Sequence, residues 1–265
     1  MTFKSVDSYR AFARAVRRDF RYARTADQEE FLKVLAATSP SRSLTMKAGF
    51  VLWRAQLGHD WRKLDQDGVS HEIPTAFGPE RMKPIPEKAS DGRVNPRGIA
   101  CLYLATQKET AILEVRPLIG GYVSVAQFTV LKDLKLINCS APEIGNLTFL
   151  DKNLSAGDIE KIVWSEINRA FSEPVERGSD SLDYVPTQII AEAFKLNAFD
   201  GIAYKSSFGE DAFNVALFDA AAADLINCGL YRIDDVSVAI SEQDNPYFMK
   251  RHYKKPDRAV SRDPD

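Results

Sequence analysis

Short apolar runs alternate along this chain with segments of helical periodicity, and this alternation constrains the fold more than any other feature. A run of roughly four to eight apolar residues between turn residues indicates a buried strand, whereas apolar residues spaced three and four apart indicate one face of a helix. Strands are expected at 50–53, 101–105, 122–131, 134–137, 202–204, 213–218 and 230–238, and helices at 107–115, 156–171, 184–196 and twice before residue 44. Because the two patterns are mixed and no repeat is visible, the sequence predicts an α+β fold.

The start of the chain is expected to form a small helical extension. Apolar side chains recur at helical spacing in two runs, at 6–16 and 31–35, and Ser39-Pro40-Ser41 then ends the pattern. Every candidate site residue lies after this break, so the extension is interpreted as a regulatory or partner-docking appendage. The predicted organisation is an extension at 1–44, a main domain at 45–240 and a loose tail at 241–265.

Two local features flank the predicted strand at 101–105. Residues 72–98 are rich in Pro, Gly and charge and lack periodicity, which predicts a long loop of the kind that often carries function. Thr106 is followed three positions later by Glu109, which is the spacing of a capping box. Thr106 is therefore expected to cap the helix at 107–115.

The overall charge is nearly balanced. The chain has 35 Lys and Arg against 37 Asp and Glu, a net charge of −2, so no general attraction to nucleic acid or to an anionic membrane is expected. Basic residues do crowd 10–24 and 250–262, where a solvated helix face and a frayed terminus are favoured over nucleic-acid contact. No apolar stretch reaches the roughly 18 residues that span a bilayer, and no signal peptide is visible. A cytoplasmic location without membrane contact is expected.

Several common enzyme classes lack their sequence signature here. Cys101, Cys139 and Cys228 lie far apart and are not in C-x-x-C spacing, which favours buried thiols over a disulfide or a zinc site. The three histidines do not stand at metal-ligand spacing, so no metal is expected. No P-loop, Rossmann G-x-G-x-x-G or G-x-S-x-G elbow occurs, although a Ser-His-Asp triad assembled from distant residues stays open.

A set of ordered segments carries a family resemblance. They are Phe50-Val51-Leu52-Trp53-Arg54-Ala55, Gly92-Arg93-Val94-Asn95-Pro96-Arg97-Gly98-Ile99, Leu102-Tyr103-Leu104-Ala105, Thr110-Ala111-Ile112-Leu113-Glu114-Val115, Asp200-Gly201-Ile202-Ala203-Tyr204-Lys205-Ser206-Ser207 and Asn214-Val215-Ala216-Leu217-Phe218. In this order, over roughly residues 45–240, they resemble the RES-domain family, which is named for an Arg, a Glu and a Ser. No single segment is decisive, but the ordered set is specific.

The resemblance can be carried over residue by residue. Arg54 matches the family's Arg, Glu114 its Glu, Ser206 its Ser, and Tyr103 the tyrosine of the strand before the Glu helix. These four are the candidate catalytic residues. Ser207 is the weaker match for the family serine, and it joins two further residues as candidates for substrate binding, Arg93 and Asn214.

The resemblance implies both a fold and an activity. The fold is similar to that of diphtheria-toxin-like ADP-ribosyltransferases, and the activity consumes NAD by splitting its nicotinamide-ribose bond, as a glycohydrolase or a phosphorylase. NAD is then a substrate, and no cofactor is implied. Many relatives are bacterial toxins held by an Xre-like helix-turn-helix antitoxin, so the chain is expected to be a bacterial toxin or a defence effector. The partners considered are NAD, such an antitoxin and a second copy of the chain in a homodimer.

The chemical properties of these residues also suit NAD cleavage, independently of the family resemblance. Cleavage of the bond to nicotinamide develops an oxocarbenium-like ribose and releases a neutral base, so a carboxylate such as Glu114 beside the ribose is the main need. The Arg54 fork suits a pyrophosphate or the carboxylate, the Tyr103 ring suits nicotinamide, and Ser206 can bond the ribose or the amide.

Structural interpretations and other functions remain as alternatives. Arg54 and Glu114 could form a buried ion pair, Tyr103 could be a core aromatic residue, and the serine pair could close a turn. Arg93 could serve to shape its loop. The alternative functions are an ADP-ribosyltransferase that modifies a macromolecule and a non-catalytic nucleotide-binding module. Water, phosphate and protein all stay open as acceptors.

Overall fold

The structure of the protein is a computed structural model that describes residues 1–66, 68–140, 154–173, 181–209, 211–237 and 240. The chain divides into two compact units, Met1–Asp234 and Asp235–Asp265, and the described helices and strands lie in the first. None of the described helices combines the length and the apolar character that crossing a bilayer requires. The tail prediction at 241–265 falls outside the described residues.

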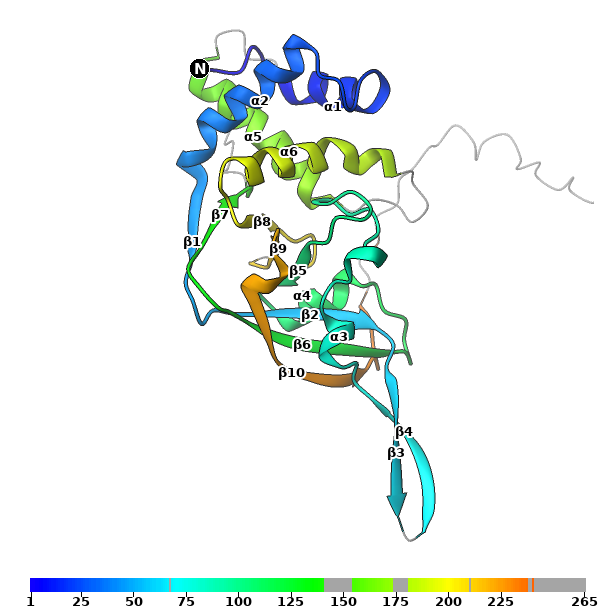
Figure 1. The fold of residues 1–265 in the computed structure, drawn as a ribbon. Helices are drawn as coiled ribbons and strands as arrows, with labels where there is room; N and C mark the ends of the chain where they lie inside the picture. Colours follow the sequence, from blue (N-terminus) through cyan, green and yellow to red (C-terminus); the bar gives the residue numbers. More distant parts are fainter. Residues whose placement is uncertain (67, 141–153, 174–180, 210, 238–239, 241–265) are drawn as a thin grey trace, which may run out of the picture. The chain divides into compact units, whose positions relative to one another are not determined.

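A mixed sheet of eight strands forms the centre of the first unit, in the order β1-β7-β8-β9-β5-β2-β6-β10 (Figure 1). Neighbouring strands are antiparallel except β7 and β8, which run parallel. The strands are β1 Ser43–Met46, β2 Val51–Leu57, β5 Leu102–Ala105, β6 Tyr122–Val130, β7 Leu134–Asn138, β8 Gly201–Lys205, β9 Phe213–Leu217 and β10 Ala223–Arg232. With the helices, this sheet confirms the predicted α+β fold.

One internal seam of the sheet, between β2 and β5, has little strand pairing. β2 and β5 share the single register pair Trp53–Ala105, whereas β2 pairs with β6 over the whole of Val51–Leu57. The two strands therefore diverge on either side of Trp53, and backbone groups beyond this pair need other partners. The candidate site lies where these two strands diverge.

Helices pack against the sheet in two places. Four long helices gather beside β7 and β8, and the short helix α4, Lys108–Glu114, packs on β2, β5 and β6 (Figure 1). The four are α1 Ser8–Arg18, α2 Ala26–Thr38, α5 Ala156–Ser172 and α6 Val185–Leu196. Shorter helical segments are α3 Pro79–Met82, η1 Ser39–Arg42, η2 Pro86–Lys88, η3 Ser181–Tyr184 and η4 Ala220–Ala222.

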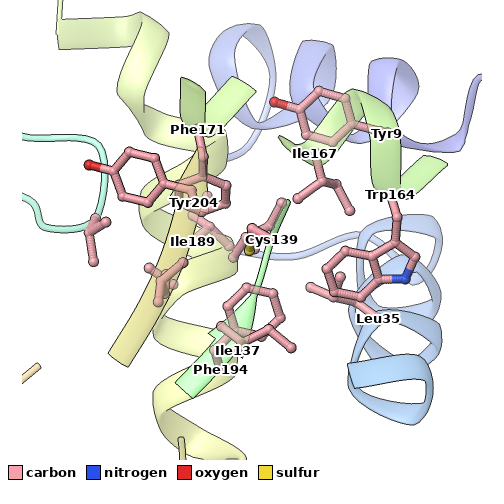
Figure 2. Packing of buried hydrophobic residues seen from close by; sticks show 14 of the residues in the cluster. Tyr9, Leu35, Ile137, Cys139, Trp164, Ile167, Phe171, Ile189, Phe194 and Tyr204 are labelled. Carbon is pink, nitrogen blue, oxygen red and sulfur yellow. The ribbon is translucent and has the colours of Figure 1, made fainter. Parts of the chain in front are cut away.

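Alternation along the strands builds one core on each face of the sheet. On β8, Ile202 and Tyr204 join the cluster beneath the long helices, while Ala203 joins the cluster on the opposite face. Successive strand side chains point to opposite faces, so this alternation follows from the strand geometry. Figure 2 shows the helix-side core, in which Trp164 and Phe194 stack at 6.1 Å between ring centroids.

The N-terminal helices share that core. Leu35 of α2 is fully buried in the same cluster as Trp164 of α5 (Figure 2), whose indole N–H donates to Thr38 Oγ1 at 3.2 Å. Arg10 of α1 donates two hydrogen bonds to the Glu166 carboxylate of α5. The helices expected before residue 44 are confirmed, and the division of the chain at residue 44 stays a prediction.

Three local predictions differ from the structure. The segment expected to be a loop begins in a hairpin, formed by β3 Asp60–Gln66 and β4 Val69–Thr75, whose largely exposed residues give little apolar pattern to read. The last strand lies at Ala223–Arg232 rather than 230–238, because its half-exposed residues form an edge of the sheet. Thr106 does not cap α4, since its hydroxyl is bonded to the backbone of Phe213 instead.

Candidate active site

A cleft of about 630 Å³ opens where β2 and β5 diverge. It is lined by residues from β2, β5, α4 and the loop before β5, with contributions from β8 and β9. The structure brings five of the predicted site residues to this cleft, namely Arg54, Arg93, Tyr103, Glu114 and Asn214. A sixth, Ser206, reaches it through a hydrogen bond to Glu114.

Arg54 bridges the seam between the two strands. Its Nη1 donates to the Tyr103 carbonyl of β5 at 3.0 Å, which satisfies a backbone acceptor that the interrupted strand pairing leaves without a partner across the seam. Burial lowers the pKa of Arg54 from its usual value to about 10, so the guanidinium stays charged at neutral pH. Its Nε is buried with no hydrogen-bond partner among the described residues. Arg54 therefore has a hydrogen-bond donor, its Nε–H, that no described residue uses.

Tyr103 is fixed through its hydroxyl group. The phenol donates to Asn95 Oδ1 at 2.6 Å and accepts from the Val94 N–H at 3.0 Å. Burial raises the pKa of Tyr103 well above its usual value, so the phenol remains a neutral donor. Tyr103 is partly buried and lines the cleft. Its orientation is thus set by the loop that precedes β5.

That loop is held in turn by α6. The Gln188 side chain, 7% exposed, donates to the carbonyls of Gly92 and Asn95 at 3.0 Å each. A Cβ at Gly92 would lie 2.5 Å from the Tyr103 hydroxyl oxygen, so the loop approaches the tyrosine as closely as glycine permits. Gln188 and Asn95 are positioning residues that sequence reasoning missed. Asn95 stood within a quoted segment, but nothing in the helical pattern around Gln188 marked it.

Glu114 is held at the C-terminal end of α4. Its Oε1 accepts from the Ser206 hydroxyl at 2.8 Å and from Asn214 Nδ2 at 2.5 Å. A carboxylate at a helix C-terminus is opposed by the helix dipole, so these two donors offset an unfavourable position. Both described hydrogen bonds end on Oε1, which leaves Oε2 able to accept a bond from a ligand.

Two of the substrate-binding candidates have structural partners. Arg93 Nη1 donates to the Ala170 carbonyl at 3.1 Å and Nη2 donates to the Glu173 carbonyl, so the guanidinium binds the last turn of α5 while lining the cleft. The Ser207 hydroxyl donates to the Ser172 carbonyl at 2.7 Å. Of the serine pair, Ser206 contacts Glu114 and Ser207 contacts α5.

Aromatic residues complete the cleft wall. Trp53, Tyr184 and Tyr204 line it together with Tyr103. Tyr204 is 5% exposed, and burial raises the pKa of its phenol, so it is a neutral side chain shared by the core and the cleft. An apolar strand pattern indicated a core position for Tyr204 and gave no signal of its second contact.

These side chains give the cleft groups of opposite charge. A charged guanidinium with a free donor can bind an anionic group, and a carboxylate with one oxygen available can bind a hydroxyl or stabilise a nearby cation. Aromatic residues in the same wall can stack on a flat ring. The arrangement suits a ligand with a phosphate, a sugar and a heteroaromatic base.

Comparisons with known proteins identify the family of the chain. A family model described as the RES domain matches residues 51–238. Among solved structures, the crystal structure of the M. tuberculosis MbcT-MbcA toxin-antitoxin complex is similar to the chain with a TM-score of 0.39 and 14% identity, over 75% of this chain and 92% of that one. A search of curated proteins found no match. Because the family match covers most of the chain and every residue that lines the cleft, the protein belongs to the RES-domain family.

Proposed function

We propose that this protein is an NAD-consuming enzyme that cleaves the bond between nicotinamide and ribose. The observation that carries the proposal is the Glu114 carboxylate, anchored through Oε1 by Ser206 and Asn214 in a cleft that also contains Arg54 and Tyr103. Family membership supports the same activity, because the resemblance to RES domains implies NAD as substrate.

The roles follow from the charges that develop during the reaction. The C–N bond breaks, its electron pair goes to the nicotinamide nitrogen, and the ribose becomes oxocarbenium-like. Glu114 Oε2 can accept a hydrogen bond from a ribose hydroxyl and place negative charge beside the developing cation, and both interactions strengthen toward the transition state. Nicotinamide leaves as a neutral base, so the departure needs no general acid.

The remaining residues bind and orient the substrate. Arg54 carries a permanent positive charge that attracts a pyrophosphate. Its Nε–H has no partner among the described residues and can donate to a pyrophosphate oxygen. Tyr103, fixed by Asn95 and Val94, offers a ring face for nicotinamide. An acceptor then attacks the anomeric carbon: water gives ADP-ribose and a proton, and phosphate gives ADP-ribose-1-phosphate.

The biological role that we propose follows from the loss of cellular NAD. An enzyme that removes NAD arrests growth, so the protein would act as a toxin or a defence effector inside the cytoplasm. The family resemblance implies control by an Xre-like antitoxin protein. We expect induction of the wild-type chain in a bacterium to lower cellular NAD and slow growth. Unchanged NAD with abundant folded protein would contradict this role.

The enzymatic test uses purified full-length protein incubated with NAD in phosphate-free and in phosphate-containing buffer, with products separated by chromatography. Free nicotinamide in either buffer supports the proposed class of reaction. ADP-ribose identifies water as the acceptor, ADP-ribose-1-phosphate identifies phosphate, and labelled protein identifies the transferase alternative. NAD that stays intact while still binding to the protein would favour a non-catalytic nucleotide-binding module and overturn the proposal.

A further inference from the structure

A second pocket adjoins the cleft on the side of the loop before β5. Its volume is about 260 Å³, and it shares Arg54, Gln56, Arg81 and Tyr103 with the cleft. The rest of its wall comes from residues 83–101, which run from the end of α3 to the start of β5. The shared residues make the pocket an annex of the cleft rather than a separate site, and we call it the basic annex.

The basic annex is strongly cationic. Of the described residues that line it, Arg54, Arg81, Lys83 and Lys88 are basic and none is acidic. Lys83 is paired with Asp224 at 2.7 Å, and the Arg81 guanidinium lies 5.1 Å from the centre of the Phe77 ring, whereas Lys88 makes no ion pair among the described residues. A wall that carries basic residues and no acidic one, in a chain of net charge −2, favours an anionic ligand.

Arg54 supplies an independent observation in the wall common to both pockets. One nitrogen, Nη1, is used by the Tyr103 carbonyl, and the buried Nε has no partner among the described residues. A buried donor without an acceptor is costly, and a phosphoryl oxygen is among the acceptors that a guanidinium binds strongly. The unsatisfied donor of Arg54 and the two lysines in the same pocket wall favour the same ligand chemistry.

We propose that the basic annex is a phosphate subsite that extends the cleft. Its ligand is a phosphoryl group, which three sources could supply: the pyrophosphate of NAD, an additional 2′-phosphate as in NADP, or free inorganic phosphate. As a phosphate-binding site the annex stands independently of catalysis. Its part in choosing the dinucleotide rests on the proposed function.

The first experiment measures inorganic phosphate binding by calorimetry, with the full-length protein in phosphate-free buffer. The annex variant is Arg81→Gln/Lys88→Gln, which removes two exposed cations and leaves Arg54 in place. The matched control is Arg97→Gln, which removes one charge from an exposed position of the same loop that does not line the annex. Circular dichroism checks that each protein is folded, and Lys88→Gln alone replaces the double variant if that variant is unfolded.

We expect the wild type to bind phosphate and the annex variant to bind it at least about tenfold more weakly, because charge-assisted contacts are lost. The control should bind phosphate as the wild type does. Absence of binding to the wild type, or equal affinities of the wild type and the annex variant, would overturn the proposal. Phosphate alone undergoes no turnover, so this result does not depend on NAD cleavage.

The second experiment identifies the source by titrating NAD and NADP into the same proteins. All of them carry Glu114→Gln, so that the dinucleotides persist during the measurement. Equal losses of NAD and NADP affinity in the annex variant assign the pyrophosphate to the annex, and a loss confined to NADP assigns the 2′-phosphate. Weaker phosphate binding with unchanged affinity for both dinucleotides assigns free phosphate.

Discussion

Shortening Leu35 to alanine tests whether the N-terminal helices belong to the main fold. Leu35 is fully buried in the cluster that contains Trp164 of α5 and Phe194 of α6. Removing a buried leucine side chain costs about 2 to 5 kcal/mol, of which part is the lost transfer free energy and part the cavity left behind. Leu35 packs where three helices meet, so we expect a loss of about 3 kcal/mol in the free energy of unfolding.

The size of the domain converts this loss into a measurable shift. For a domain of this length, each 1 kcal/mol lowers Tm by about 2 to 4 °C, so Leu35→Ala should lower Tm by about 6 to 12 °C. Leu32→Ala is the matched control, because Leu32 lies on the same helix and is partly buried, and its shift should be clearly smaller. Far-UV circular dichroism and tryptophan fluorescence should shift together. Separate transitions, or a helix signal that melts while the fluorescence transition stays in place, would refute the shared core.

Three further predictions concern the cleft. Arg54→Lys should lower NAD turnover by about tenfold to a thousandfold, because an ammonium cannot reproduce the guanidinium fork; near-normal turnover would leave Arg54 a structural residue. Asn214→Ala removes one of the two donors to Glu114 Oε1 and should lower kcat/KM by about tenfold or more. Asn227→Ala, at an exposed position of the edge strand β10, should not produce this change. Gly92→Ala places a methyl group 2.5 Å from the Tyr103 hydroxyl oxygen and should lower stability by about 1 to 3 kcal/mol in a urea titration; unchanged stability would mean that the loop tolerates a Cβ there.

The sequence predicted most of the buried helices and strands, because the residues that such elements bury are apolar and recur at the spacing of the element. The strands at Leu102–Ala105 and Phe213–Leu217 lie inside the sheet, and the helices at Ala156–Ser172 and Val185–Leu196 cover it, so each carries a clear periodicity. Most residues of the hairpin at Asp60–Gln66 and Val69–Thr75 are exposed, so the apolar pattern of its sequence is weak. Exposed elements therefore escaped prediction where buried ones did not.

The residues that meet at the cleft were predicted as far as the family resemblance reached, and their roles stay a prediction. Glu114, Ser206 and Asn214 are distant in sequence and meet through hydrogen bonds in the structure. The contacts that support them are harder to read from sequence, because Gln188 binds backbone carbonyls, which any residue supplies. Thr106 illustrates the same limit: its spacing to Glu109 predicted a helix cap, but the N-cap of α4 is Gln107 and the Thr106 hydroxyl is bonded to the Phe213 backbone.

Release of nicotinamide from NAD by the Glu114→Gln protein, compared with the wild type and with Glu109→Gln, tests the central claim most directly. Both substitutions remove one carboxylate from α4, but Glu109 lies in its first turn, is largely exposed and is absent from the cleft wall. We predict that the wild type and Glu109→Gln release nicotinamide at similar rates and that Glu114→Gln is slower by on the order of a hundredfold, since charge stabilisation at the ribose is lost. Equal rates for all three folded proteins, or no release by the wild type, would contradict the account.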